Sequence, residues 1–280
     1  MQIEEIMLEL RVQGIIAPHI NTWKTLSGGT MSTVYALISD GEPTLVVKIN
    51  DPKTVQFESS YLRAHEGNPL FARVVYIDAD YRYFVYTYQP GETEYPRDRK
   101  AETLQTLVSE VINRSIPMVD SSDFGYADEP SASWKEFLML RYRWAQVTID
   151  TRLSNADHKL AQQLIYSTQD QALQYLLHGD CGVHNFLFQR GQLTGVIDPI
   201  PTIGEPLYDL IYAYCSSPDQ LDTETIQQAV GRMEPKFTIG RDLPNEVLIG
   251  LYYRIATCIL HHPQDFETYM EAWEYWKKRR

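Results

Sequence analysis

The chain has 280 residues, of which 44% are hydrophobic and 22% charged, and its formal net charge at pH 7 is −12. This composition is close to that of ordinary globular proteins, and the length suffices for one large domain or two modest ones. The excess of acidic groups argues against nucleic-acid phosphate as a partner. It would attract a cationic small molecule, although the same charge also serves simply to keep a protein soluble.

Membrane and disulfide classes are also disfavoured. No stretch of about 18 apolar residues occurs, so we expect no transmembrane helix and no membrane partner. The N-terminal segment MQIEEIMLELRVQG carries acids where a secretory signal carries bases, which predicts an amphipathic helix in a cytoplasmic protein. The three cysteines lie far apart, which excludes a disulfide framework and a CxxC zinc site.

The N-terminal third predicts a small lobe of sheet and helix. Residues 1–20 are expected to form a helix. Residues 22–50 have an alternating pattern of side chains and many β-branched residues, interrupted by glycine. This pattern predicts two or three antiparallel strands, with a hairpin turn at SDGEP. A helix over residues 54–66 and two further strands follow, and a Pro-Gly pair then ends the pattern. We therefore expect a nucleotide-binding lobe over residues 1–90.

The remainder, residues 91–280, predicts a mainly helical lobe. Short strands are expected on both sides of the segment HGDCGVHN, and a loop rich in Ser, Asp and Pro is expected over residues 115–133. Helices are expected over 97–114, 134–150, 155–176 and most of the chain beyond Tyr208. The fold class predicted from these elements is α+β.

The segment HGDCGVHN carries the side chains with the clearest chemistry. It supplies Asp180 and, five residues later, Asn185, and Asp198 follows thirteen residues after Asn185 in GVIDPIP. An aspartate that orients an attacking hydroxyl, with an amide and a carboxylate oxygen that share Mg²⁺, is the set of groups that phosphoryl transfer needs.

This spacing resembles that of the aminoglycoside phosphotransferase and choline kinase family, and the continuation DPIPTIGEPLYDL extends the likeness. The resemblance implies a bilobal protein-kinase-like fold that uses ATP (or GTP) and Mg²⁺. It implies transfer of the nucleotide γ-phosphate to a hydroxyl of a small molecule. Asp180 would orient or accept the hydroxyl proton, and Asn185 and Asp198 would bind Mg²⁺.

Two further residues receive supporting roles from the resemblance. His178 is expected to hydrogen-bond the metal-binding aspartate, and Asp209 in YDL is expected to be a buried acceptor that organises the catalytic loop. Cys181 lies inside the loop, and we interpret it as a small packing residue.

The resemblance also implies a nucleotide site in the N-terminal lobe. Lys48 ends the apolar strand TLVVK, and Glu58 follows ten residues later. Each alone would be an ordinary surface charge, but in a kinase Lys48 would bind the nucleotide phosphates and Glu58 would hold Lys48. In FVYTYQPGE, the backbone atoms expected to hydrogen-bond an adenine ring lie near Thr87, Tyr88 and Gln89.

The segment SGGTMSTVY occupies the place of a nucleotide loop. Where a glycine-rich loop has three glycines, this chain has Ser27, Gly29 and Ser32. The hydroxyl and backbone N–H groups from Ser27 to Ser32 are expected to contact phosphate.

The triplet Asp123-Phe124-Gly125 matches the magnesium triplet of protein kinases only in its letters. The metal aspartate of a kinase follows the catalytic loop, whereas Asp123 precedes His178 by 55 residues. We predict a turn anchored by Phe124 and Tyr126.

Several acceptor classes stay open. Gly182 stands where serine/threonine kinases have a lysine, and no Ala-Pro-Glu segment follows Asp198, so a small-molecule acceptor is favoured over a protein. Acids outnumber bases beyond Asp198, which suits amine-bearing acceptors, whereas the terminal KKRR argues against an antibiotic pocket. Open alternatives are a kinase of an endogenous sugar or amino alcohol, a protein kinase, and a non-catalytic nucleotide-binding regulator on the same fold.

Overall fold

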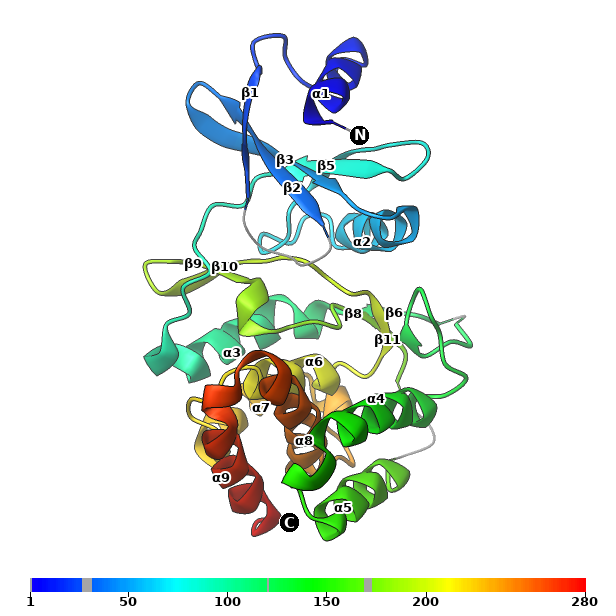
Figure 1. Ribbon diagram of the computed structural model, residues 1–280, viewed down its shortest axis with the longest axis vertical. Helices are drawn as coiled ribbons and strands as arrows, with labels where there is room; N and C mark the ends of the chain where they lie inside the picture. Colours follow the sequence, from blue (N-terminus) through cyan, green and yellow to red (C-terminus); the bar gives the residue numbers. More distant parts are fainter. Residues whose placement is uncertain (1, 27–31, 120, 169–172) are drawn as a thin grey trace. The chain divides into compact units, whose positions relative to one another are not determined.

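The structure, a computed structural model, divides into two compact units, each described here by itself (Figure 1). The first comprises Met1–Gly91 with Thr194–Ile197, and the second Glu92–Leu193 with Asp198–Arg280. Within the residues that the structure describes, no helix is both long and apolar enough to cross a bilayer. The described residues are 2–26, 32–119, 121–168 and 173–280.

The first unit is built on an antiparallel sheet of five strands in the order β1-β2-β3-β5-β4. Asp40 and Gly41 join β2 to β3, and both have positive φ, 52° and 86°, as a two-residue type I′ turn requires. The predicted SDGEP hairpin is thus confirmed. The strands are β1 (Thr22–Thr25), β2 (Thr33–Ser39), β3 (Glu42–Ile49), β4 (Val74–Ile77) and β5 (Tyr83–Thr87).

Two helices, α1 (Ile3–Val12) and α2 (Pro52–Ala64), belong to this unit. The apolar face of α1 joins the same buried cluster as Leu37, Val47 and Val85 of the sheet. The carboxylate of Asp51 accepts hydrogen bonds from the first backbone N–H groups of α2, a cap that stabilises a helix by about 1 kcal/mol. This start point, together with contacts to β4 and β5, sets which side chains of α2 are buried.

The second unit is mainly helical. Its central helix α8 is apolar along most of its length and contacts α4, α5, α6 and α9. The α-helices are α3 (Lys100–Glu110), α4 (Trp134–Ile149), α5 (Asn155–Tyr166), α6 (Leu207–Cys215), α7 (Thr223–Val230), α8 (Leu243–His261) and α9 (Phe266–Lys277). The short 3₁₀ helices are η1 (Arg97–Arg99), η2 (Ile112–Arg114), η3 (Asp150–Arg152), η4 (Val183–Asn185), η5 (Pro235–Phe237) and η6 (Pro263–Asp265).

Short strands carry the segments with the predicted chemistry. One sheet has the order β6-β8-β11-β7, and β9 with β10 forms a two-stranded sheet. Because β8 ends at Leu177, the loop that begins at His178 starts from a hydrogen-bonded strand. The strands are β6 (Ile116–Pro117), β7 (Gly125–Tyr126), β8 (Tyr175–Leu177), β9 (Phe186–Gln189), β10 (Gln192–Val196) and β11 (Thr202–Gly204).

The helix predicted over residues 155–176 is too long. In the structure α5 ends at Tyr166, and the hydroxyls of Ser167 and Thr168 donate to carbonyls of the preceding turn. Such local hydrogen bonds compete with continuation of a helix. At the far end of the predicted range, β8 pairs with β6 and β11, so strand pairing overrides the helical pattern.

The turn predicted at Asp123-Phe124-Gly125 is wrong, because Gly125 begins strand β7 and pairs with β11, whereas the predicted packing of the neighbouring aromatic side chains is present. Phe124 makes an isolated antiparallel bridge with Ser131, and the ring of Tyr126 packs edge-on against Phe137 at 5.1 Å between centroids. Gly125 has φ 80°, and a side chain there would overlap the Phe137 ring.

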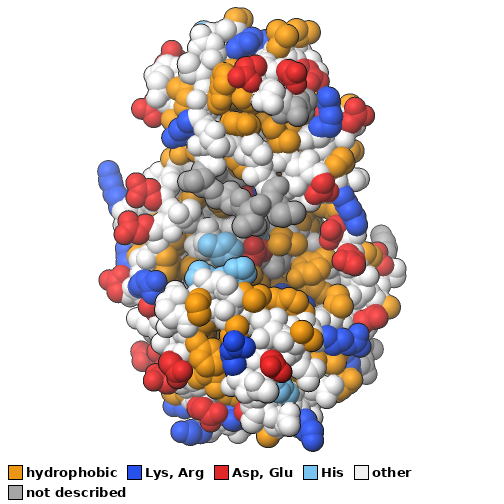
Figure 2. Space-filling view, in the orientation of Figure 1, with side chains coloured by type: hydrophobic (Ala, Val, Ile, Leu, Met, Phe, Trp, Pro, Cys, Tyr) orange, Lys and Arg blue, Asp and Glu red, His pale blue; other side chains and the backbone are white. Residues whose placement is uncertain are grey.

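Charged side chains are mixed over the surface. On the face shown in Figure 2, Lys and Arg lie among Asp and Glu, and the coloured residues form no continuous basic patch.

Candidate active site

In the first unit, β3 and α2 bring Lys48 and Glu58 together. The Lys48 Nζ atom lies 2.7 Å from Glu58 Oε1, and the two side chains are only 5% and 4% exposed. The pairing of Lys48 with Phe84 of β5 fixes the position of Lys48 within the sheet. A buried pair of this kind leaves an uncompensated charge when either partner is removed.

Part of the predicted nucleotide loop lies outside the described residues. This applies to Ser27 and Gly29, whereas Ser32 is described. The hydroxyl of Ser32 accepts a hydrogen bond of 2.7 Å from the side-chain amide of Asn50, which directly follows β3. This hydrogen bond holds Ser32 next to the end of β3, the strand that contains Lys48.

Two backbone N–H groups of the segment predicted to bind adenine already make hydrogen bonds within the protein. The backbone N–H of Thr87 donates to the Arg73 carbonyl, and that of Tyr88 donates to the Thr44 carbonyl, both at 2.9 Å. Across the described parts of the chain, the backbone N–H of Gln89 has no such partner. An adenine ring that binds here would therefore take its backbone donor from Gln89.

In the second unit, the loop after β8 brings Asp180 and Asn185 together. The amide nitrogen of Asn185 donates to Asp180 Oδ2 at 2.8 Å and to the Asp180 carbonyl at 3.0 Å. Among the residues that the structure describes, the amide oxygen of Asn185 accepts no hydrogen bond. His184 contacts the same carboxylate oxygen, with its Nε2 atom 3.4 Å from Asp180 Oδ2.

The carboxyl group of Asp180 is held in its ionised form. Burial alone would raise its pKa, but a hydrogen bond and positive charge from His184 and a hydrogen bond from Tyr212 lower the pKa to about 2. A carboxylate with so low a pKa is a weak base. Its chemistry is to accept a hydrogen bond from an attacking hydroxyl and orient it rather than to remove the proton early.

Asp209, on α6, holds the start of the loop. Its two carboxylate oxygens accept the backbone N–H groups of His178 and Gly179 at 2.8 and 3.0 Å. Burial raises the pKa of Asp209 to about 7, although these donors act in the opposite direction. The ring Nδ1 of fully buried His178 faces the backbone N–H of Asp180 at 3.3 Å. The hydrogen bond predicted between His178 and the metal-binding aspartate stays a prediction.

Cys181 is fully buried, and burial raises the pKa of its thiol. A thiolate nucleophile requires the opposite shift. The interpretation of Cys181 as a packing residue therefore agrees with its surroundings.

Gly179 is expected to be irreplaceable in this loop. Its φ is 79°, and a Cβ atom would overlap the Ile200 carbonyl and the Thr202 side chain. Gly179→Ala should lower the free energy of unfolding by about 2–4 kcal/mol, measured by urea denaturation. Gly191→Ala is the matched control, because Gly191 has φ 74° but faces only the flexible end of Arg99. Equal losses in the two variants would contradict the close approach at Gly179.

Asp198 has φ 55°, in the left-handed region that few residues other than glycine adopt. Such a conformation costs roughly 1–3 kcal/mol and is found most often at functional sites. Among the described residues, no group of three or more His, Cys, Asp or Glu side chains forms a metal site by itself. An amide and a carboxylate oxygen, with nucleotide phosphates completing the coordination, are a donor set that fits Mg²⁺.

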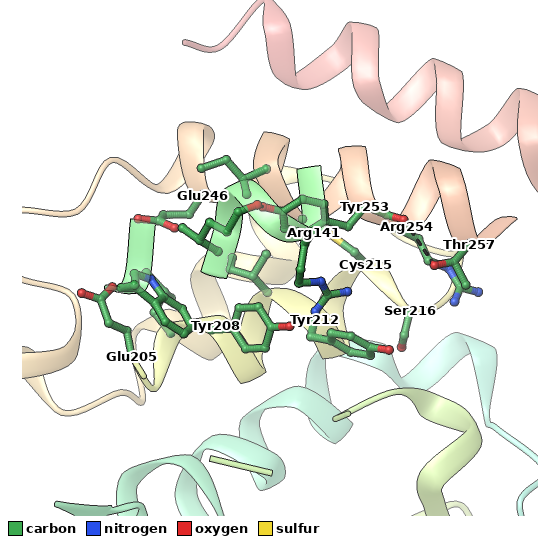
Figure 3. A pocket seen from close by; sticks show the side chains of 16 residues that line it. Arg141, Glu205, Tyr208, Tyr212, Cys215, Ser216, Glu246, Tyr253, Arg254 and Thr257 are labelled. Carbon is green, nitrogen blue, oxygen red and sulfur yellow. Dashed lines mark hydrogen bonds between the residues drawn. The ribbon is translucent and has the colours of Figure 1, made fainter. Parts of the chain in front are cut away.

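Sequence reasoning missed a pocket in the second unit, whose lining residue Ser216 accepts a hydrogen bond from Val183 of this loop (Figure 3). Side chains of α4, α6 and α8 line it, and it has about 620 Å³ of empty volume, part of it open to solvent. One lining residue, Tyr212, is among the groups that lower the pKa of Asp180. The spacing of Tyr212 could have pointed to it in the sequence. Tyr212 follows Asp209 by three residues, and residues three apart share one face of a helix.

The sequence model of the phosphotransferase enzyme family (APH) matches residues 22–237, which is more than half of the chain. The chain belongs to this phosphotransferase family. No curated protein sequence matches it significantly. The family resemblance predicted from the motifs is confirmed, and the coarse function follows: a phosphotransferase of the small-molecule kinase type.

Solved structures of this phosphotransferase family and of a choline kinase are similar over almost the whole chain. A thermostable mutant of aminoglycoside phosphotransferase APH(4)-Ia, in ternary complex with AMP-PNP and hygromycin B, has a TM-score of 0.62 and 18% identity over 99% of this chain and 97% of that chain. The ADP-bound aminoglycoside phosphotransferase APH(2'')-Ib has a TM-score of 0.60 and 18% sequence identity, and the match covers 97% of each chain. Choline kinase from Cryptosporidium parvum Iowa II has a TM-score of 0.62 and 11% sequence identity, and the match covers 99% of this chain and 95% of that chain. At these identities the likeness shows the fold, and it confirms the predicted α+β, kinase-like class.

Proposed function

We propose that this protein transfers the γ-phosphate of ATP, with GTP as the alternative, to a hydroxyl group of a small molecule. The observation that carries the proposal is the contact between Asp180 and Asn185 in a loop held by Asp209. It supports the proposal because an ionised carboxylate lies beside an amide whose oxygen accepts no hydrogen bond among the described residues. Nucleotides in the similar structures, AMP-PNP and ADP, support a nucleotide as the donor.

The proposed reaction makes one bond and breaks one. The acceptor hydroxyl oxygen bonds to the γ-phosphorus, and the bond from that phosphorus to the β,γ-bridging oxygen breaks with its electron pair leaving on the nucleoside diphosphate. Asp180 accepts the hydrogen bond of the attacking hydroxyl and orients it, and the proton passes to solvent as the oxygen–phosphorus bond forms. The low pKa of Asp180 suits this late proton transfer.

The residues of the first unit are proposed to bind the nucleotide. Lys48 would bind phosphate oxygens while Glu58 holds its ammonium group, and Gln89 would donate its backbone N–H to the adenine. Ser27, Gly29 and Ser32 remain proposed phosphate contacts.

Asn185 and Asp198 are proposed to hold Mg²⁺, which when bound would neutralise negative charge on the transferring phosphate. We expect Asp198→Ala to abolish Mg²⁺-dependent nucleotide binding, measured by isothermal titration calorimetry with and without Mg²⁺. Asp123→Ala is the matched control, since Asp123 is an exposed aspartate and lies in the Asp-Phe-Gly segment whose letters match the magnesium triplet. Unchanged Mg²⁺-dependent binding in Asp198→Ala would refute the metal role.

A phosphate-transfer screen tests the function as a whole. Radiolabelled nucleotide is offered with aminoglycosides, other antibiotics, sugars, amino alcohols and a peptide library. Transfer to a small molecule supports the proposal and separates antibiotic inactivation from a kinase of an endogenous metabolite. Nucleotide binding without transfer to any of them would favour the non-catalytic regulator, and transfer only to peptides would favour a protein kinase.

A further inference from the structure

Two residues in the wall of the pocket connect it to the loop that carries Asp180. Ser216 accepts a hydrogen bond from the backbone N–H of Val183 at 3.0 Å, and Tyr212 contributes to the lowered pKa of Asp180. A ligand at this end of the pocket would therefore lie near that loop. Figure 3 shows Glu205 and Glu246 near one end of the pocket, Arg254 and Thr257 near the other, and Arg141 between them. The charges along the pocket therefore bear on the chemistry of the acceptor.

Arg141 is the central cation of this pocket. Its guanidinium lies over the rings of Tyr208, Tyr212 and Tyr253, at 5.6, 5.7 and 4.9 Å from their centroids. These rings hold the group in place by cation–π contact and take it partly out of water. Arginine stays charged at every physiological pH, so the pocket contains a fixed positive charge.

No carboxylate neutralises this charge directly. Over the described part of the chain, Arg141 makes no hydrogen bond and no ion pair. Asp180 acts on it only through longer-range electrostatics, and the Asp180 carboxylate already accepts a hydrogen bond from Asn185. A guanidinium offers a planar fork of N–H donors that matches the oxygens of a carboxylate or phosphate. The unused fork of Arg141 points to such an oxyanion as its partner.

The acidic end of the pocket is arranged differently. Arg241 forms an ion pair with Glu205 and another with Glu246 at 3.3 Å, so both carboxylates already have a cation. Glu205 is 4% exposed, and its Oε1 atom has no hydrogen-bond partner among the described residues. The hydroxyl of Tyr208 is likewise buried and unpaired within the same set. A buried acceptor without a donor is costly, and a hydroxyl group of a ligand would satisfy it.

We propose that the acceptor is a small hydroxylated anion, with a carboxylate or phosphate bound by Arg141 and a hydroxyl bound by Glu205 and Tyr208. This inference rests on the proposed function and specifies its acceptor. It differs from the cationic acceptor that the overall charge of −12 suggests. The charges inside the pocket favour an anion. The acidic side chains of the pocket are paired with Arg241, whereas Arg141 has no ion pair among the described residues.

The test compares ligands that differ only in one charged group. One series is glucose, glucuronate, glucose 6-phosphate and glucosamine; the other is glycerol, glycerate, glycerol 3-phosphate and 3-amino-1,2-propanediol. Binding to the full chain is measured by isothermal titration calorimetry at millimolar ligand. We expect the carboxylate or phosphate member to bind about 10- to 100-fold more tightly than the neutral member, as charge-assisted hydrogen bonds to arginine predict. The member preferred identifies the kind of oxyanion.

Variants of Arg141 decide whether this residue causes the preference. Arg141→Met should abolish it, and Arg141→Lys, which keeps the charge but loses the fork, should retain a reduced preference. Arg143→Met is the matched control, because Arg143 is an exposed arginine on the same helix and should leave the preference intact. The lysine variant also serves if the methionine variant fails to fold, as judged by circular dichroism.

The outcomes separate this inference from the proposed function. Equal affinity within both series, tightest binding of the ammonium members, no binding at all, or a preference that survives in Arg141→Met would overturn the anion site. Phosphate transfer to a neutral or cationic compound would then still support the kinase. Conversely, Arg141-dependent anion binding without transfer to any acceptor would support the anion site and count against the kinase reaction.

Discussion

Asp180→Asn is expected to lower kcat for phosphate transfer by about 10²- to 10⁴-fold while nucleotide affinity changes little. An asparagine can still accept the hydrogen bond of 2.8 Å from Asn185 through its amide oxygen. It carries no negative charge to accept the hydrogen bond of the attacking hydroxyl and orient it. The loss should therefore fall on the chemical step, and steady-state kinetics with a separate nucleotide titration will show it.

Asp128→Asn is the control for this prediction, because Asp128 is an exposed aspartate of the same unit. The pH profile adds an independent check. Since the pKa of Asp180 is lowered to about 2, the carboxylate stays ionised as the pH falls through the weakly acidic range. Protonation of Asp180 should thus cause no loss of kcat above about pH 4. A variant that keeps most of the wild-type kcat would show that Asp180 is not the catalytic carboxylate.

Glu58→Ala is expected to destabilise the first unit by about 3–5 kcal/mol, because it leaves the buried ammonium group of Lys48 without its partner. Lys48→Met should have a similar effect, because it removes the ammonium group that is paired with the buried Glu58 carboxylate. Hydrogen exchange of the backbone amides in β3 and α2 measures this loss in the unit concerned. Both variants should also weaken nucleotide binding, since Lys48 is the proposed phosphate ligand.

The double variant separates the ion pair from its two members. Removing both charges with Lys48→Met and Glu58→Leu should destabilise the unit much less than the sum of the single changes, because no unpaired charge remains buried. Lys53→Met is the control, as Lys53 is an exposed lysine on α2. If Glu58→Ala accelerates exchange no more than Lys53→Met does, the pair does not stabilise the unit.

The order and spacing of polar residues could be read from the sequence because they act over short distances along the chain. Asp180 and Asn185 are five residues apart and meet within one loop, so their contact depends on local backbone geometry. Lys48 and Glu58 are ten residues apart, and a strand followed directly by a capped helix is enough to bring them together. The hairpin turn at Asp40 and Gly41 is equally local.

Strand pairing changed two local expectations. The helical pattern predicted for residues 155–176 does not show that β6 and β11 pair with residues 175–177, since the partners are distant in sequence. Similarly, the N–H groups of Thr87 and Tyr88 are used by segments that precede them by 14 and 44 residues. Backbone hydrogen bonds between distant segments leave no mark in local periodicity.

The sequence by itself determined the family, the α+β class and the order of the groups proposed for catalysis, because these follow from short motifs and local periodicity. Only the tertiary structure decided the character of the pocket beside Asp180. Arg141, Glu205 and Tyr253 come from parts of the chain separated by many tens of residues, and the packing of α4, α6 and α8 brings them to one cavity. The net charge counts all acids equally, whereas packing pairs Glu205 and Glu246 with Arg241 and leaves the guanidinium of Arg141 to a ligand.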